Sequence, residues 1–207
     1  MAVGVVVNPV AGSGRMRRMW PAVRAALQRH FGELVVEETA AVCEASLYAR
    51  KLALDGVELV IAAGGDGTIS EVADGLLRAG GGVQLGIMPA GTGSDLSRFL
   101  GLDGDIEAAA ARIASGSTRK IDVGCVDYID EHGALASRHF INISSLGLSG
   151  PTARAVNNSR TGDRVSGKAL FLWHTVRELI RYRFQDVRIA VDDQPSFEAR
   201  IAVVAVA

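Results

Sequence analysis

Three short apolar runs in the first half of the chain each end in a glycine-rich loop, and residues at helical spacing follow each loop. The runs predict strands over residues 3–7, 59–63 and 85–88, because apolar runs without alternation are typical of strands buried on both faces. Strands that alternate with helices form βαβ units and a parallel sheet. The three loops are therefore expected at one edge of the sheet, where such sheets bind ligands.

The pattern changes near Lys120. Residues 121–126 and 139–145 read as strands, residues 167–182 as a helix, and residues 187–191 and 197–205 as a strand pair. The predicted fold class is α/β. A Rossmann-like parallel sheet with helices over residues 1–120 precedes an incomplete, mostly antiparallel β-sandwich domain over residues 121–207.

Charge and hydropathy exclude several classes of protein. The net charge of −1 gives no overall field that would favour nucleic acid, so no nucleic-acid partner is expected. No stretch of about 18 apolar residues is present, so contact with lipid would be peripheral. Cys43 and Cys125 share no short spacing, which favours two reduced thiols in a cytoplasmic protein.

The loop from Gly64 to Thr68, with the sequence GGDGT, carries most of the chemical information. Its glycines let the main chain approach a ligand closely, and the helix that follows would point N–H groups at a phosphate. Thr68 is placed to cap that helix or to bind a phosphate oxygen. Asp66 would repel a phosphate unless a metal ion or a reacting hydroxyl lay between them.

The other two loops have a similar design. Residues 89–95 read PAGTGSD, and residues 8–15 read NPVAGSGR and add Arg15, a cation suited to phosphate. Neither loop is a P-loop or a G-x-G-x-x-G fingerprint. Three such loops at one sheet edge favour a single shared site over three unrelated turns.

These strings resemble the signatures of the diacylglycerol kinase catalytic domain. GGDGTISEV from Gly64 resembles its first signature and PAGTGSDLSR from Pro89 its second, while Asn8-Pro9 with Gly12-Ser13-Gly14 resembles the family's opening motif. Residues 121–124, 140–142 and 146–148 resemble the entry into its second domain. The GGDGT motif is shared with NAD kinases, whereas the second signature is typical of the lipid kinases.

The resemblance to diacylglycerol and sphingosine kinases implies ATP- and Mg²⁺-dependent transfer of the γ-phosphoryl group to a lipid hydroxyl, with diacylglycerol or a related lipid as acceptor at a membrane surface. It implies that Asp66 is catalytic, through the metal of Mg-ATP or on the acceptor hydroxyl. It places nucleotide contacts at Asn8, Ser13, Arg15, Thr39, Gly64, Gly65, Asp66, Gly67, Thr68, Ile69, Ser70, Glu71, Gly91, Thr92 and Asp95.

Two features depart from the family pattern. Ser70 and Ser94 stand where the family usually has Asn, and the chain ends inside an apolar run at residues 201–207. We expect further C-terminal sequence with an acidic catalytic residue, so this chain should bind nucleotide better than it phosphorylates lipid. An open sheet edge could also pair with a second copy, as a homodimer. The alternatives are a regulatory nucleotide-binding module without catalysis and an NAD kinase.

Overall fold

The computed structural model describes residues 2–89, 95–102, 105–130, 132–158 and 167–206. These residues form two compact units, 1–142 and 143–207, and each unit is described by itself. The expected division into domains at residue 120 stays a prediction.

The first unit contains a four-stranded parallel sheet in the order β2-β1-β3-β4. Its elements are β1 (Val3–Val7), α1 (Ala11–Phe31), β2 (Val35–Glu38), α2 (Glu44–Leu54), β3 (Leu59–Gly64), α3 (Asp66–Arg78), β4 (Gln84–Pro89), α4 (Asp95–Phe99), α5 (Ile106–Ala114), β5 (Gly124–Ile129) and β6 (Leu135–Phe140).

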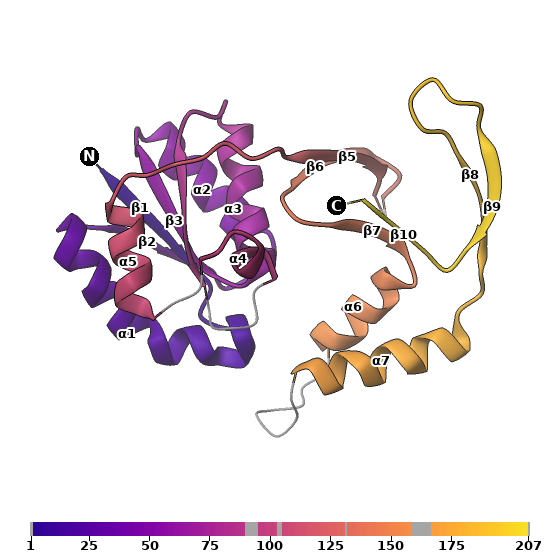
Figure 1. Ribbon diagram of the computed structural model, residues 1–207, viewed down its shortest axis with the longest axis horizontal. Coiled ribbons are helices and arrows are strands. Elements are labelled where there is room, and N and C mark those ends of the chain that lie inside the picture. The colour runs from indigo at the N-terminus through magenta and orange to yellow at the C-terminus, as the bar shows by residue number, and fades with distance from the viewer. Residues whose placement is uncertain (1, 90–94, 103–104, 131, 159–166, 207) are drawn as a thin grey trace. The chain divides into compact units, whose positions relative to one another are not determined.

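Helices cover both faces of this sheet (Figure 1). Successive side chains of a strand point to opposite faces. Val5 and Ile61 accordingly pack with α1 and α5, whereas Val6 and Val60 pack with α2 and α3. Residues of β1 and β3 are buried throughout, which explains why these strands read as continuous apolar runs.

Helices α2 and α3 approach closely at Gly75. A Cβ atom on Gly75 would lie 2.2 Å from the carbonyl oxygen of Ser46 and 2.9 Å from the Cβ of Ala49. Only glycine therefore fits at this crossing without a shift of the backbone.

The antiparallel β5–β6 hairpin is fastened to α3 through the buried carboxylate of Asp74. One carboxylate oxygen accepts hydrogen bonds from Ser46 Oγ at 2.9 Å and Arg78 Nε at 2.8 Å. The other accepts from the backbone N–H of His139 at 2.9 Å and lies 3.0 Å from the Nδ1 of that residue. Asp74 thus joins α2, α3 and β6 at one point.

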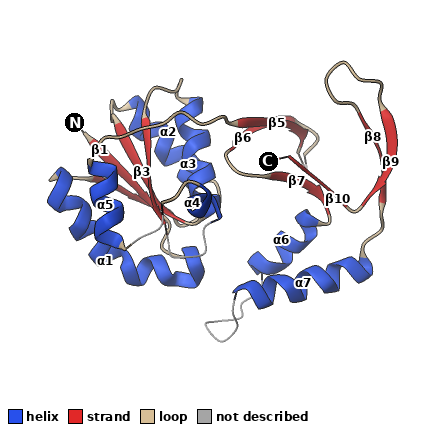
Figure 2. Cartoon of the chain, viewed as in Figure 1, coloured by secondary structure: helices blue, strands red, loops and turns tan. Residues whose placement is uncertain are grey.

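The second unit contains β7 (Ser144–Gly147), α6 (Ser149–Asn158), α7 (Gly167–Arg181), β8 (Gln185–Ile189), β9 (Phe197–Ile201) and β10 (Val203–Val206). Strands β7 and β10 form one antiparallel pair, and β8 and β9 form another (Figure 2). The predicted fold class is confirmed: helices and a parallel sheet come first, and antiparallel strand pairs follow.

Several predicted boundaries are wrong. The single strand predicted over 139–145 is the end of β6, a bend and β7. The strand predicted over 197–205 is also interrupted, at Ala202. Turns within apolar sequence give no glycine or proline signal, so the pattern did not indicate these breaks.

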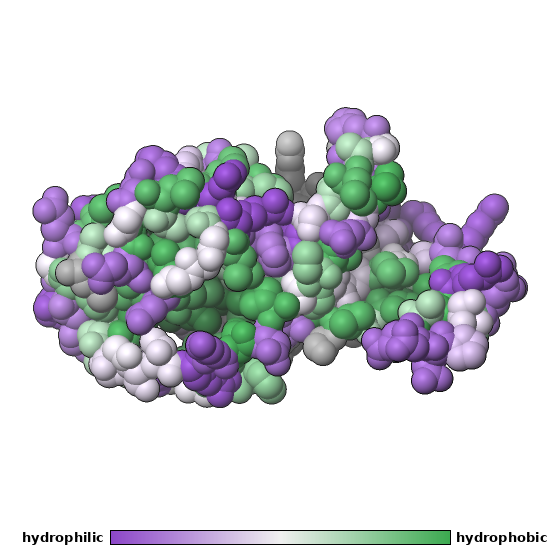
Figure 3. All heavy atoms as spheres, turned by 90° about the horizontal axis from the view of Figure 1, so that it is seen from above, coloured by the Kyte–Doolittle hydropathy of each residue, from purple (hydrophilic) through white to green (hydrophobic). Residues whose placement is uncertain are grey.

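No helix in the described part of the chain is long and apolar enough to cross a membrane. Hydrophilic and hydrophobic side chains are interspersed over the face drawn in Figure 3.

Candidate functional site

The strand order places a topological switch point between β1 and β3. The chain leaves β1 through α1 toward β2, and later leaves β3 through α3 in the opposite direction, toward β4. The helices that follow these two strands consequently lie on opposite faces of the sheet. Open parallel sheets bind ligands in the crevice beyond the carboxyl ends of two such strands.

The register of the strands places the predicted site residues beside one another at this crevice. Val7 lies opposite both Glu38 and Ala63, and Ala63 lies opposite Met88. The residues that follow, Asn8, Thr39, Gly64 and Pro89, are therefore level at one rim. The N–H of Asn8 donates to the carbonyl of Ala63 at 3.0 Å, and the N–H of Thr39 donates to that of Val7 at 2.9 Å.

Asn8 joins two of the glycine-rich loops directly. Its Nδ2 donates to Thr68 Oγ1 at 3.0 Å, and its Oδ1 accepts from the N–H of Val10 at 3.1 Å. Thr68 is buried and Asn8 half-buried. The prediction that separate loops build one site is thus supported by a contact between residues 60 positions apart in the chain.

The first loop has a left-handed backbone. Gly12, Ser13 and Gly14 have φ values of 61°, 57° and 78°. Serine rarely adopts such a conformation, which costs about 1 kcal/mol or more. Ser13 is exposed, and Arg15 follows it at the start of the regular part of α1, also exposed.

The second loop opens α3 with Gly65 at the N-cap in an extended conformation. Of the two roles predicted for Thr68, the cap of this helix is wrong, because Thr68 lies within the first turn and its hydroxyl accepts from Asn8. Its role in binding a phosphate oxygen stays a prediction. Gly65 has no side chain that could accept from the first N–H groups of the helix. These groups suit an anionic ligand, which the positive end of the helix dipole would also favour.

Close packing against the side chain of Thr68 explains why residue 64 is a glycine. A Cβ atom there would lie 2.5 Å from Thr68 Oγ1 and 2.6 Å from Thr68 Cβ. A Cβ atom on Gly65 or Gly67 would meet nothing within 4 Å, so the protein itself leaves space there.

The remaining predicted contacts differ in accessibility. Ser70 and Asp66 are half-buried, whereas the side chain of Ile69 is buried in the core, so a contact from Ile69 would have to come from its main chain. Glu71 forms an ion pair with Arg138 of β6, with 3.4 Å between Oε1 and Nη2. Gly91, Thr92 and Ser94 lie outside the described residues, and Asp95 begins α4.

A cavity of about 710 Å³ adjoins the rim. Arg15 lines it together with Met88 and Pro89 from the end of β4. Ser97 and Arg98 of α4, the last two residues of the string PAGTGSDLSR, also line it. Arg98 was not among the predicted contacts, although a cation within a glycine-rich signature is a signal that could have indicated it.

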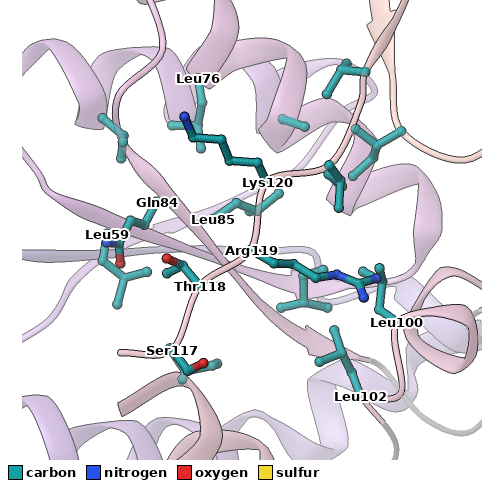
Figure 4. A pocket seen from close by; sticks show the side chains of 18 of the residues that line it. Leu59, Leu76, Gln84, Leu85, Leu100, Leu102, Ser117, Thr118, Arg119 and Lys120 are labelled. Carbon is teal, nitrogen blue, oxygen red and sulfur yellow. The ribbon is translucent and has the colours of Figure 1, made fainter. Parts of the chain in front are cut away.

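A second cavity, of about 660 Å³, lies beside β4 and is lined by residues of α3, of α5 and of the segment after α5. Leu59, Leu85 and Leu100 line it, and the segment with Arg119 and Lys120 crosses it (Figure 4). None of the predicted nucleotide contacts is among its described lining residues.

The described residues contain no group of three or more histidine, cysteine, aspartate or glutamate side chains that could hold a metal ion. Mg²⁺ is commonly held by one or two carboxylates together with substrate phosphates, and this requires no cluster of protein ligands. The carboxylate of Asp66 at the start of α3 fits that arrangement.

The fold and the joined loops define an α/β domain of the kind that binds phosphate-bearing ligands at a switch point. The family model of the diacylglycerol kinase catalytic domain matches residues 2–126, so the chain belongs to this family.

Named relatives agree with this assignment. Over 143 residues, the chain is 32% identical to a diacylglycerol kinase of Staphylococcus epidermidis and 33% identical to one of Staphylococcus haemolyticus. The matches cover 69% of this chain and 42% and 41% of those proteins. A crystal structure described as a diacylglycerol kinase from Bacillus anthracis matches with a TM-score of 0.61 at 28% identity, over 99% of this chain and 63% of that one. The chain thus spans less than half of the two curated relatives.

Proposed function

We propose that this chain is the nucleotide-binding part of a lipid kinase that uses Mg-ATP and phosphorylates a lipid hydroxyl, with diacylglycerol or a related lipid as acceptor. Membership of the diacylglycerol kinase family supports the reaction class. The observation that carries the nucleotide site is the hydrogen bond from Asn8 to Thr68, because it joins two glycine-rich loops at the switch point.

In the proposed reaction, the acceptor hydroxyl oxygen forms a bond to the γ-phosphorus and loses its proton, while the bond between the γ-phosphorus and the β–γ bridging oxygen breaks and ADP leaves. Such transfers depend mainly on positioning and on stabilisation of negative charge. The first N–H groups of α3 would bind phosphate oxygens, and Arg15 at the adjoining cavity would supply positive charge. Asp66 would hold Mg²⁺, which neutralises charge on the phosphates when it is bound.

The first test is thermal unfolding with and without Mg-ATP. A ligand at about a hundred times its dissociation constant raises the free energy of unfolding by about 2.7 kcal/mol. No shift with any nucleotide would contradict the proposal. A shift with NAD in addition to the shift with Mg-ATP would favour an NAD kinase, which binds both nucleotides.

Asp66→Ala is expected to weaken Mg-ATP binding at least about tenfold, which lowers the shift at the same concentration to about 1.4 kcal/mol. In EDTA, Asp66→Ala should bind ATP more tightly than wild type does. A carboxylate without its metal repels phosphate, and the alanine variant lacks that carboxylate. Asp193→Ala, in the exposed turn between β8 and β9, is the matched control. Equal binding by Asp66→Ala and the control in Mg²⁺ would exclude this role for Asp66.

The acceptor requires a separate experiment. Phosphate transfer to diacylglycerol, sphingosine and monoacylglycerol in mixed micelles, followed with labelled ATP, would rank the candidate lipids. Nucleotide binding without transfer to any of them would favour a regulatory nucleotide-binding module for this chain.

A further inference from the structure

Strand β6 contacts α3 at three positions. Arg78 donates to the carbonyl of Ser137, Asp74 accepts from His139, and Arg138 pairs with Glu71. Of the three contacts, the Glu71–Arg138 ion pair is the nearest to the start of α3, where the proposed phosphate site lies. Glu71 follows Asp66 by five residues, or about 7.5 Å along the helix axis.

Glu71 presents an electrostatic problem at this position. Its side chain is only 16% exposed, so solvent screens its charge weakly. A carboxylate so close to the start of α3 would oppose the effect of the helix dipole and repel polyphosphate. Arg138 is its ion-pair partner among the described residues, and the arginine side chain is 39% exposed.

We propose that Arg138 is a positioning residue for the nucleotide, which acts by neutralising Glu71 and not by binding the phosphates itself. This inference rests on the proposed nucleotide site. It assigns a role in nucleotide affinity to a strand that lies outside all three glycine-rich loops.

A double-mutant cycle on the dissociation constant of Mg-ATP tests this role. Arg138→Gln should weaken binding about fivefold, the effect of one added negative charge at this distance when screening is intermediate. Arg138→Lys should retain most of the affinity because it keeps the charge. Arg138→Gln made in the Glu71→Gln background should cause no further loss of affinity relative to Glu71→Gln alone.

A series of ligands of decreasing charge separates charge compensation from distortion of the site. The loss caused by Arg138→Gln should decrease from ATP to ADP to AMP, vanish for adenosine, and shrink as salt is added. Arg188→Gln is the control, because Arg188 forms an exposed ion pair of 2.9 Å with Glu198 on the β8–β9 hairpin.

Three results would overturn the inference. They are unchanged Mg-ATP binding by Arg138→Gln, a loss that persists in the Glu71→Gln background, and an equal loss for adenosine. The second result would instead indicate direct contact between Arg138 and the phosphates. If wild type itself binds no nucleotide, both the proposed function and this role fail.

Discussion

Replacing Asp74 with alanine is expected to lower the free energy of unfolding by about 3 kcal/mol, even though Asp74 is not among the proposed ligand contacts. Its carboxylate is almost fully buried and accepts from Ser46, Arg78 and the backbone of His139. Each hydrogen bond to a charged group contributes about 1.5–3 kcal/mol. The expected loss is smaller than their sum because Arg78 and His139 are partly exposed and regain water.

Asp74→Asn should lower the free energy of unfolding by nearly as much as Asp74→Ala. In either orientation of the amide, its NH₂ group faces a hydrogen-bond donor. Denaturant unfolding measures both variants, and the slope of the free energy against denaturant shows whether the transition stays two-state. Glu107→Gln, at an exposed ion pair with Arg29, is the control and should leave the midpoint nearly unchanged. A midpoint for Asp74→Asn equal to that of wild type would show that the carboxylate does not hold the hairpin.

The same carboxylate makes stability depend on pH in the acid range. Burial alone raises the pKa of Asp74, but the hydrogen bonds from the backbone of His139, from Arg78, from Ser46 and from the His139 ring lower it to about 2. Because the folded pKa lies below the usual 3.8, this contribution is present above about pH 4 and is lost as pH falls toward 2. Asp74→Ala should therefore show a shallower loss of stability than wild type between these pH values.

Gly64→Ala is expected to remove most of the stabilisation by Mg-ATP. The added Cβ would lie 2.6 Å from Thr68 Cβ, which is fixed to the helix backbone, so the start of α3 must move. That movement would break the hydrogen bond between Asn8 and Thr68 and misalign the first N–H groups of the helix. An affinity loss of about thirtyfold would reduce a shift of about 2.7 kcal/mol to about 0.9 kcal/mol.

Gly67→Ala provides the comparison, because its Cβ would meet no protein atom within 4 Å. Without ligand, its free energy of unfolding should equal or slightly exceed that of wild type, since alanine favours helix. Any loss of nucleotide response in Gly67→Ala would then report a ligand close to the backbone. A full response from Gly64→Ala would show that the contact between the loops is dispensable for binding.

The parallel sheet could be predicted from the sequence because β1 and β3 are buried on both faces and lack alternation. The meeting of the loops after these strands followed from the geometry of parallel sheets alone. Glycine and serine at residues 12–14 oppose a helix, and these residues adopt left-handed conformations, so the loop before the regular part of α1 was also predictable.

Contacts between distant residues were not predictable in the same way. An aspartate at position 74 falls within an otherwise helical pattern, and nothing nearby in the sequence indicates that His139, 65 residues later, donates to it. The Glu71–Arg138 ion pair is equally non-local. Periodicity predicts which face of a helix or strand is buried. The partner of a charged side chain depends on the tertiary fold, which a single sequence does not reveal.

The position of β1 between β2 and β3 has a consequence for how the protein is made. Val3 pairs with Leu59, so β1 obtains its second neighbour only after more than fifty further residues have been synthesised. Parallel pairing requires such a crossover, and the closure of a long loop precedes the contacts that compensate for it. Until β3 emerges, a fully apolar strand has one open edge, which is the condition under which nascent chains associate or require a chaperone.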